Sequence, residues 1–173
     1  MHKLLLVPVL ALFVAATAVA QTPTEADLVR VIGTKKDGWA PVAFAKLKAK
    51  MTPADVAKDF PGADKVSKFG FVKLPAKGAA GVREYELYFA KDKATQIPTE
   101  LQSVKIIFDP KLTDAAGFWD TLLKVCVAKY GPAKPEQVEK RLVTWIGPRF
   151  KPAQLVKFPE RGGAVLQLQV SIP

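Results

Sequence analysis

Alternating apolar and polar positions predict an antiparallel sheet assembled from both halves of the chain. In residues 164–172, apolar side chains occupy every second position, which is typical of a strand with one buried face. Similar runs predict further strands at 65–74, 82–90, 101–109, 142–146 and 154–158. In the second of these runs, one face carries Tyr85, Leu87 and Phe89, and the other carries Glu84, Glu86 and Tyr88. We therefore expect one side of the sheet to be buried and the other to be partly open to solvent.

Helical spacing separates the two groups of strands. Apolar residues recur every three or four positions over 115–130, which predicts a long helix that starts near Asp114. Gly131-Pro132 is expected to end this helix, because glycine favours helix C-termini and proline cannot continue the helix. Residues 133–140 then read as a polar connection.

Capping patterns predict two shorter helices nearer the N-terminus. The first spans 24–32, and the second spans 53–60, after a Thr52 cap with Asp55 three residues later. The intervening residues 42–50 fit either a strand or a helix.

The resulting order of helix, three strands, helix and three strands predicts an α+β fold. We expect residues 51–173 to form one domain of two similar halves, about 51–109 and 114–172, after an N-terminal segment at 21–50. The halves are inferred from element order, because no sequence identity between them is visible. The helices are expected to pack on one face of the antiparallel sheet.

Residues 1–20 have the pattern of a secretory signal peptide. Lys3 precedes an apolar run from Leu4 to Val14, and Ala18-Val19-Ala20 supplies small residues just before Gln21. We therefore expect cleavage before Gln21 and a periplasmic or secreted protein. No later stretch approaches ~18 consecutive apolar residues, so no transmembrane segment is expected after cleavage.

The positive net charge of the chain limits the classes of partner that it is expected to bind. The chain has a formal net charge of +10, and the predicted signal peptide accounts for one of those charges. A cationic exported protein attracts anionic lipids, glycans and acidic proteins, although the same charge also serves to keep a surface soluble. No nucleic acid partner is expected, because the sequence has no nucleic-acid-binding motif.

The sequence offers little catalytic chemistry. Its single histidine, His2, lies in the predicted signal peptide, and its single cysteine, Cys126, lies on the apolar stripe of the long helix. Glu84 and Glu86 share one strand face, where nearby cations favour a cross-strand charge ladder over an acid–base pair. We therefore expect no catalytic residue, no metal and no cofactor. An enzyme that uses a serine or a carboxylate is the minor alternative.

Two stretches resemble small bacterial envelope proteins. Residues 50–56, Lys-Met-Thr-Pro-Ala-Asp-Val, and residues 106–109, Ile-Ile-Phe-Asp, resemble the repeat found in the small lipoprotein of the outer-membrane barrel assembly machine and in β-lactamase inhibitory proteins. The helix end at 129–132, followed by a strand with Trp145, resembles another envelope pattern. Gln21 stands where a lipoprotein has its cysteine. The resemblance implies a scaffold that binds proteins, not a catalyst.

The sequence therefore predicts an exported, non-catalytic binding protein whose partner is an envelope or extracellular protein. A cationic protein that binds anionic lipid or glycan is the alternative. The loop at 147–152 places an aromatic side chain between two cations, and such side chains are typical interface anchors. Packing of Phe150 onto the core is the competing interpretation of this loop. The candidate contacts are Trp39, Lys91, Lys93, Arg149, Phe150 and Lys151.

Overall fold

The protein folds around a six-stranded antiparallel sheet, which confirms the predicted α+β class. The computed structural model describes residues 22–76, 78–160 and 163–172, so the predicted signal peptide lies outside the described residues. The strands are β1 (Phe71–Pro75), β2 (Val82–Lys91), β3 (Pro98–Phe108), β4 (Leu142–Ile146), β5 (Pro152–Glu160) and β6 (Gly163–Ser171). Their order across the sheet is β1-β2-β3-β6-β5-β4.

The helices are α1 (Glu25–Ile32), α2 (Pro53–Asp59), α3 (Pro110–Thr113), α4 (Phe118–Tyr130) and α5 (Pro135–Glu139), with short 3-10 turns at Lys35–Asp37, Val42–Phe44 and Pro148–Phe150. Three of the helices, α1, α2 and α4, lie in segments predicted to be helical, whereas α3 and α5 were not predicted. Within the described ranges, no helix combines the length and the apolar character needed to cross a membrane.

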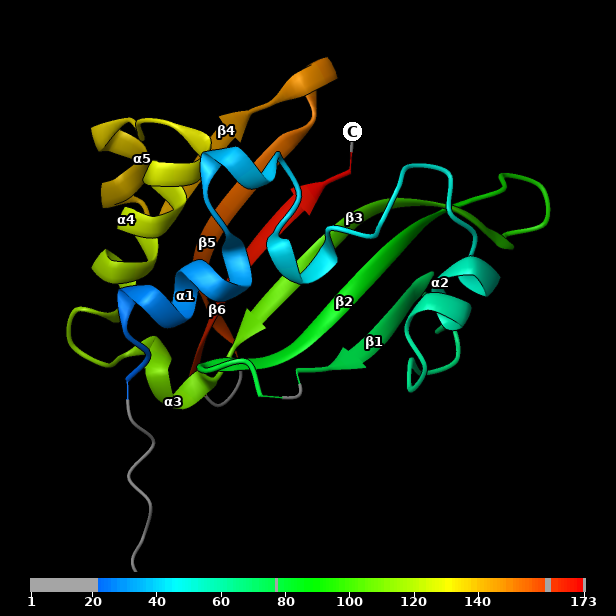
Figure 1. The fold of residues 1–173 in the computed structure, drawn as a ribbon, viewed down its shortest axis with the longest axis horizontal. Helices are drawn as coiled ribbons and strands as arrows, with labels where there is room; N and C mark the ends of the chain where they lie inside the picture. Colours follow the sequence, from blue (N-terminus) through cyan, green and yellow to red (C-terminus); the bar gives the residue numbers. More distant parts are fainter. Residues whose placement is uncertain (1–21, 77, 161–162, 173) are drawn as a thin grey trace, which may run out of the picture.

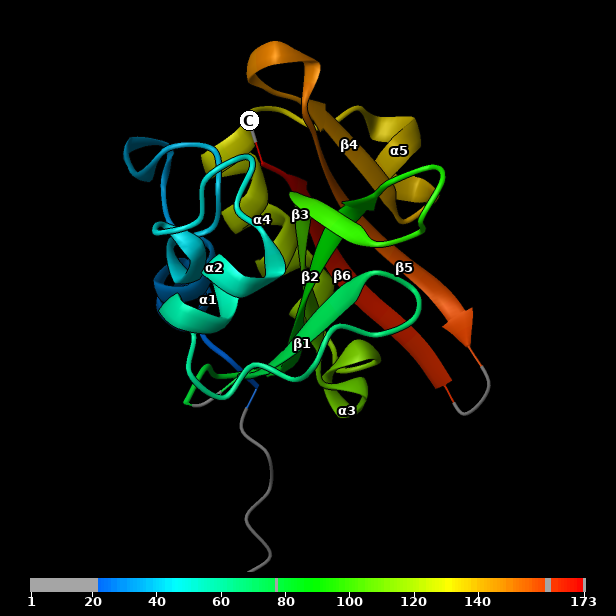
Figure 2. The same cartoon turned by 90° about the vertical axis from the view of Figure 1, so that its right-hand side faces the viewer.

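One face of the sheet is buried under helices, as the alternation predicts. Figures 1 and 2 show α1, α2 and α4 on the same side of the strands. Leu28 of α1, Val56 of α2 and Leu122 of α4 have no exposed surface and belong to one cluster with the inward side chains of the sheet. Because burial of apolar surface is the main favourable term in folding, this face supplies most of the stability.

Reciprocal caps start the two N-terminal helices. At α2, the Thr52 backbone N–H donates to Asp55 Oδ2 over 2.8 Å, and the Asp55 N–H donates to Thr52 Oγ1 over 3.3 Å. Thr24 and Asp27 form the same arrangement at α1. Each box satisfies backbone donors that a helix leaves unpaired in its first turn, which explains why such short segments are helical.

Several boundaries of helices differ from those predicted from the sequence. The long helix begins at Phe118 and not near Asp114, because Gly117 adopts a left-handed conformation (φ 74°) that interrupts the helical run. Residues 110–113 form α3 instead, with the Asp109 side chain as its cap. The predicted connection at 133–140 contains α5, and 42–50 begins with a 3-10 turn that buries Phe44.

Only the last residues of the predicted strand at 65–74 form a strand, β1. A turn closed by Gly70 N–H donating to Ser67 O, with Gly70 at φ 82°, separates residues 65–70 from β1. The earlier residues fold back along β1, where the N–H of Asp64 donates to Lys73 O over 3.0 Å and that of Ser67 donates to Phe71 O over 2.8 Å. The outer edge of β1 is therefore covered by its own chain.

The capping boxes predict a defined pH dependence of stability. The Thr52 backbone N–H, followed by its hydroxyl, holds the pKa of the Asp55 carboxyl below its usual range. A lowered carboxyl pKa in the folded state contributes stability above the unfolded pKa of about 3.9, and this contribution is lost as the pH falls through the folded pKa. We expect Asp55→Asn to destabilise the protein at neutral pH, and this difference to vanish towards about pH 2.

Urea unfolding followed by circular dichroism across this pH range measures the difference. Asp59→Asn, at the other end of α2 and outside the box, is the control. A gap between wild type and Asp55→Asn that stays constant with pH would show that the carboxylate charge does not stabilise the cap.

Candidate functional site

A row of polar side chains crosses the face of the sheet that the helices leave open. Register pairs place Lys73 opposite Glu86, Glu86 opposite Lys105, and Lys105 opposite Gln169. The pairing continues through β5 to β4, so one polar position comes from every strand. This polar row consists of Lys73, Glu86, Lys105, Gln169, Gln154 and Thr144. Strands far apart in sequence therefore align to make one continuous polar surface.

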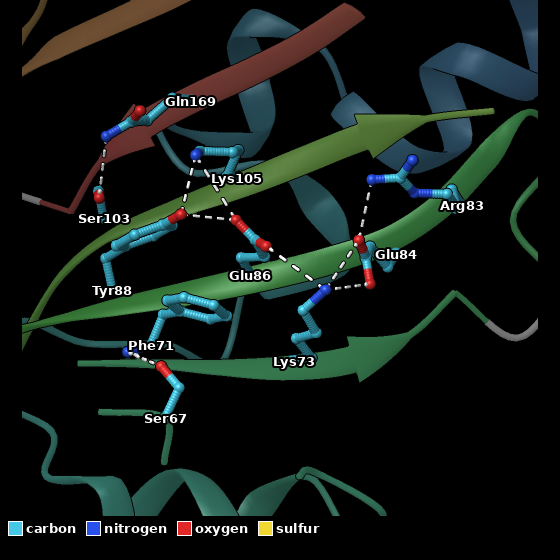
Figure 3. Close-up of polar contacts among 10 residues, drawn as sticks. All are labelled: Ser67, Phe71, Lys73, Arg83, Glu84, Glu86, Tyr88, Ser103, Lys105 and Gln169. Atoms are coloured by element: carbon cyan, nitrogen blue, oxygen red, sulfur yellow. Dashed lines mark hydrogen bonds and ion pairs between the residues drawn. The ribbon is translucent and has the colours of Figure 1, made fainter. Parts of the chain in front are cut away.

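The charged half of the polar row is a connected network centred on Glu86 (Figure 3). Glu86 is only 7% exposed, and its carboxylate accepts a 2.6 Å hydrogen bond from the Tyr88 hydroxyl. Lys105 Nζ donates to the Tyr88 oxygen over 2.9 Å and lies 3.5 Å from the Glu86 carboxylate. The buried carboxylate thus has both a neutral donor and a cation beside it, as a buried charge requires.

A second carboxylate extends the network towards solvent. Lys73 Nζ lies 3.0 Å from Glu84 and 3.8 Å from Glu86, so one ammonium bridges both acids. Arg83 makes a further 3.0 Å ion pair with Glu84. The predicted cross-strand charge ladder is therefore present, and each glutamate has cationic partners within it.

Burial and neighbouring charge keep the Tyr88 hydroxyl protonated. Burial is the largest cause, and the Glu86 carboxylate adds to it, so the pKa of Tyr88 is raised well above its usual value. A protonated hydroxyl donates to Glu86 while accepting from Lys105, which fixes the direction of both hydrogen bonds. The network therefore has a defined direction of hydrogen bonding, from Lys105 through Tyr88 to Glu86.

Aromatic rings border the network at the β1 side. Phe69 stacks on Phe71 with centroids 6.5 Å apart, and Phe71 lies 5.3 Å from the Tyr88 ring. Lys105 Nζ sits 4.5 Å from the Tyr88 centroid, a cation–π distance. Phe69 remains 68% exposed. This aromatic patch (Phe69, Phe71 and Tyr88) was not predicted from the sequence. The two-residue spacing of the phenylalanines can be read from the sequence, but their register with β2 cannot.

The loop predicted as a contact is a tight turn with an unusual backbone. The β4–β5 turn (residues 147–151) is closed by Lys151 N–H donating to Pro148 O over 3.1 Å. Arg149 and Phe150 at its centre both have positive φ, 53° and 58°. Phe150 is 88% exposed, so the interpretation that it packs on the core is wrong. Arg149 is also exposed, and Lys151 is half-buried.

Trp39 supports this turn from behind. Its ring packs edge-on against the Tyr130 ring, with the two centroids 4.9 Å apart, and the Trp39 side chain is half-buried. Gly147 lies so close to the ring that a Cβ there would stand 2.4 Å from Trp39. The side chain therefore holds the base of the β4–β5 turn.

The two remaining predicted contacts belong to the other hairpin at the same end of the sheet. Lys91 Nζ donates to the Lys68 carbonyl over 2.6 Å, and Lys93 is exposed in the turn between β2 and β3. The strand order places this turn and the β4–β5 turn on opposite sides of β6. The structure thus brings Trp39 to the β4–β5 turn and leaves the two lysines apart from it.

The remaining chemistry of the described residues is sparse. Cys126 is fully buried, and burial raises the pKa of its thiol far above the usual value, which keeps the thiol protonated and unreactive. In the part of the chain that the structure describes, no three His, Cys, Asp or Glu side chains are grouped to hold a metal ion.

Comparison with known proteins gives no relative, because no protein-family model, curated protein or solved structure matches the chain.

The network on the open face predicts strong coupling between Glu86 and Tyr88. Glu86→Gln removes the charge beside Lys105, and we expect it to lower the free energy of unfolding by about 1–3 kcal/mol. Tyr88→Phe removes the short hydrogen bond and is expected to cost about 1 kcal/mol. Because the two side chains share that bond, the double variant should lose less than the sum of the two losses. Urea unfolding of the wild type, the two single variants and the double variant measures these losses as a double-mutant cycle.

A pair outside the network provides the control. Gln154→Ala, on the uncharged half of the polar row, should be additive with Tyr88→Phe. Additive losses for Glu86 and Tyr88 would show that their contact contributes nothing to stability.

Proposed function

We propose that the protein is an exported binding protein that holds another envelope or extracellular protein through the β4–β5 turn and the adjoining open face of the sheet. The observation that carries this proposal is the Arg149-Phe150 pair, which is exposed and held in a backbone conformation that neither residue favours. Export rests on the signal-like residues 1–20.

The backbone of the turn supports a role in recognition. A left-handed conformation costs a residue with a Cβ roughly 1–2 kcal/mol, and hairpin turns with two positive φ angles favour Asn-Gly. Phe150 recovers none of this cost by packing, because it is exposed. Unfavourable conformations of this kind concentrate at functional sites. Arginine and aromatic side chains are also common anchors of protein interfaces.

The open face offers a complementary surface beside the turn. Its network fixes side chains in place before a partner arrives, which lowers the entropic cost of binding. The half-exposed aromatic patch adds apolar area to a surface that is otherwise polar.

Replacing the central pair of the turn should raise stability and weaken binding at once. We expect Arg149→Asn with Phe150→Gly to stabilise the fold by about 1 kcal/mol, because both new residues tolerate positive φ. Tagged residues 21–173 are used for affinity capture from envelope extract, at low salt and at ~0.5 M salt. Wild type should retain a discrete protein at both salt concentrations, and the double variant should lose it.

Gln96→Gly is the matched control. Gln96 also has a positive φ, 58°, but lies in the turn between β2 and β3. It should gain stability by the same mechanism and retain the captured protein. Undiminished capture by the Arg149→Asn, Phe150→Gly variant would remove the turn from the binding site, and no discrete protein at either salt would contradict the proposed function.

A cationic protein that binds anionic lipid or glycan is the second candidate. It is favoured by the four cations Lys91, Lys93, Arg149 and Lys151, which lie at the same end of the sheet. Binding through exposed charges is screened by salt, so the same capture would then yield lipid, glycan or a broad acidic background that is lost at ~0.5 M salt.

A further inference from the structure

Two adjoining pockets lie between the helical layer and the β1–β2 hairpin. Figure 1 shows α1 and α2 at separate places on the same face of the sheet, joined by residues 33–52. The first pocket has a volume of about 260 Å³ and lies where α2 ends at Phe60. The second has a volume of about 230 Å³ and lies beside α1. Ala43 and Tyr85 line both pockets, so the two spaces meet at these side chains.

The first pocket has an aromatic and aliphatic lining. The Phe44 ring packs edge-on against the Tyr85 ring with the two centroids 4.9 Å apart, and its centroid lies 6.4 Å from that of Phe60. Leu74, the register partner of Tyr85 on β1, adds an aliphatic wall. Because an apolar cavity of about 150 Å³ is large enough to bind benzene, this pocket has room for one aromatic ring with a short substituent.

Tyr85 adds one polar group to this apolar lining. The residue is only 8% exposed. Within the described part of the chain its hydroxyl has no hydrogen-bond partner, and burial raises its pKa above the usual value, so the group is protonated at neutral pH. Unlike the Tyr130 hydroxyl, it is not fully enclosed by protein atoms. Buried tyrosine hydroxyls usually have a partner, and here the pockets provide the space for one that the protein does not supply.

The charged groups near the pockets are mixed in sign and lie at their openings. Asp59 is exposed at the mouth of the first pocket. It shares an adjoining hollow with another acid and three cations: Asp55, Lys46, Lys48 and Lys58. At the second pocket, Asp27 and Arg30 form a 3.3 Å ion pair. Because opposite charges lie side by side at both openings and the aromatic walls carry none, the first pocket favours a neutral ligand.

We propose that the first pocket binds a small neutral molecule that has one aromatic ring and a carbonyl oxygen, which accepts a hydrogen bond from the Tyr85 hydroxyl. The ring packs against Phe44 and Phe60. Apolar walls with a few placed polar groups are the usual construction of small-molecule sites. The pocket lies on the helix-covered face of the sheet, opposite the open face, so this inference goes beyond the proposed function.

A matched set of single-ring compounds tests the site directly. Acetophenone is the probe, and benzoate and benzamidine have a similar shape with a negative and a positive charge. Added to residues 21–173 labelled with nitrogen-15, acetophenone should shift the amide signals of Phe44, Phe60 and Tyr85. Both charged compounds should bind at least tenfold more weakly, because burying an unpaired charge is costly. Shifts confined to the aromatic patch, or no shift up to the solubility limit of acetophenone, would overturn the inference.

Tyr85→Phe isolates the hydrogen bond because it keeps the ring. The control compound is α-methylstyrene, which has the shape of acetophenone with a methylene group in place of the carbonyl oxygen. The variant should weaken acetophenone about fivefold, the effect of losing one hydrogen bond, and leave the affinity of α-methylstyrene unchanged. Equal effects on the two compounds would overturn the role of the hydroxyl.

Two substitutions at exposed alanines locate the ligand. Ala43 lines both pockets, whereas Ala80 lines the second and not the first. Ala43→Leu should fill the first pocket and weaken acetophenone at least tenfold, and Ala80→Leu should leave its affinity unchanged. Circular dichroism checks that each variant folds, and if Ala43→Leu does not, Ala43→Val tests the same position. Loss of binding with Ala80→Leu alone would overturn the assignment to the first pocket.

The capture experiment distinguishes this site from the proposed function. Ala43→Leu should keep the captured protein, because the pocket and the β4–β5 turn are separate surfaces. If Ala43→Leu loses the captured protein, an apolar side chain of the partner occupies the pocket and the small-molecule ligand is overturned. If wild type binds acetophenone and captures no discrete protein, the proposed function fails and this inference stands.

Discussion

The antiparallel pairing of β3 with β6 is the constraint on which the rest of the fold depends. It joins two three-stranded groups, 71–108 and 142–171, into one sheet. On its inner face, Val104 opposite Val170 and Ile106 opposite Leu168 have no exposed surface. On its outer face, Lys105 lies opposite Gln169 and connects the two halves of the polar row. A slip of one residue would exchange these faces, burying the lysine and exposing the valines, so the buried core also determines the register of the open surface.

The open face and the β4–β5 turn meet the requirements of recognition in different ways. On the face, Glu86 and its partners form a closed set of hydrogen bonds and ion pairs, so the surface is fixed by its own interactions. In the turn, Arg149 and Phe150 are fixed by the hairpin itself, and Trp39 holds its base. In both arrangements, folding already bears the entropic cost of ordering the side chains. Less conformational entropy is therefore lost when a partner binds.

The sequence predicted those elements whose signal is local. The strands at 82–90 and 164–172 alternate clearly, and the caps at Thr24 and Thr52 lie within four residues of their partners, so these features were found. The first strand and the start of α4 were misplaced, because glycine conformations at Gly70 and Gly117 interrupt patterns that look continuous in composition.

The candidate site was harder to predict because it depends on contacts between distant segments. The polar row requires the register of β3 against β6, which no local pattern records. An isolated aromatic residue in a short loop has no periodicity, so the exposure of Phe150 could not be decided from the sequence. Trp39 is half-buried because its ring meets Gly147, a residue from the opposite half of the chain.

The covering of both outer strands has a consequence for assembly. The segment at 64–67 closes the edge of β1, and α5 lies beside β4, where the Gln137 side chain accepts from the Thr144 N–H over 3.5 Å. A sheet with two open edges can add copies on both sides and grow without limit. Because each outer strand here is covered by a segment of its own chain, the architecture terminates fibre growth where a sheet with bare edges would propagate it.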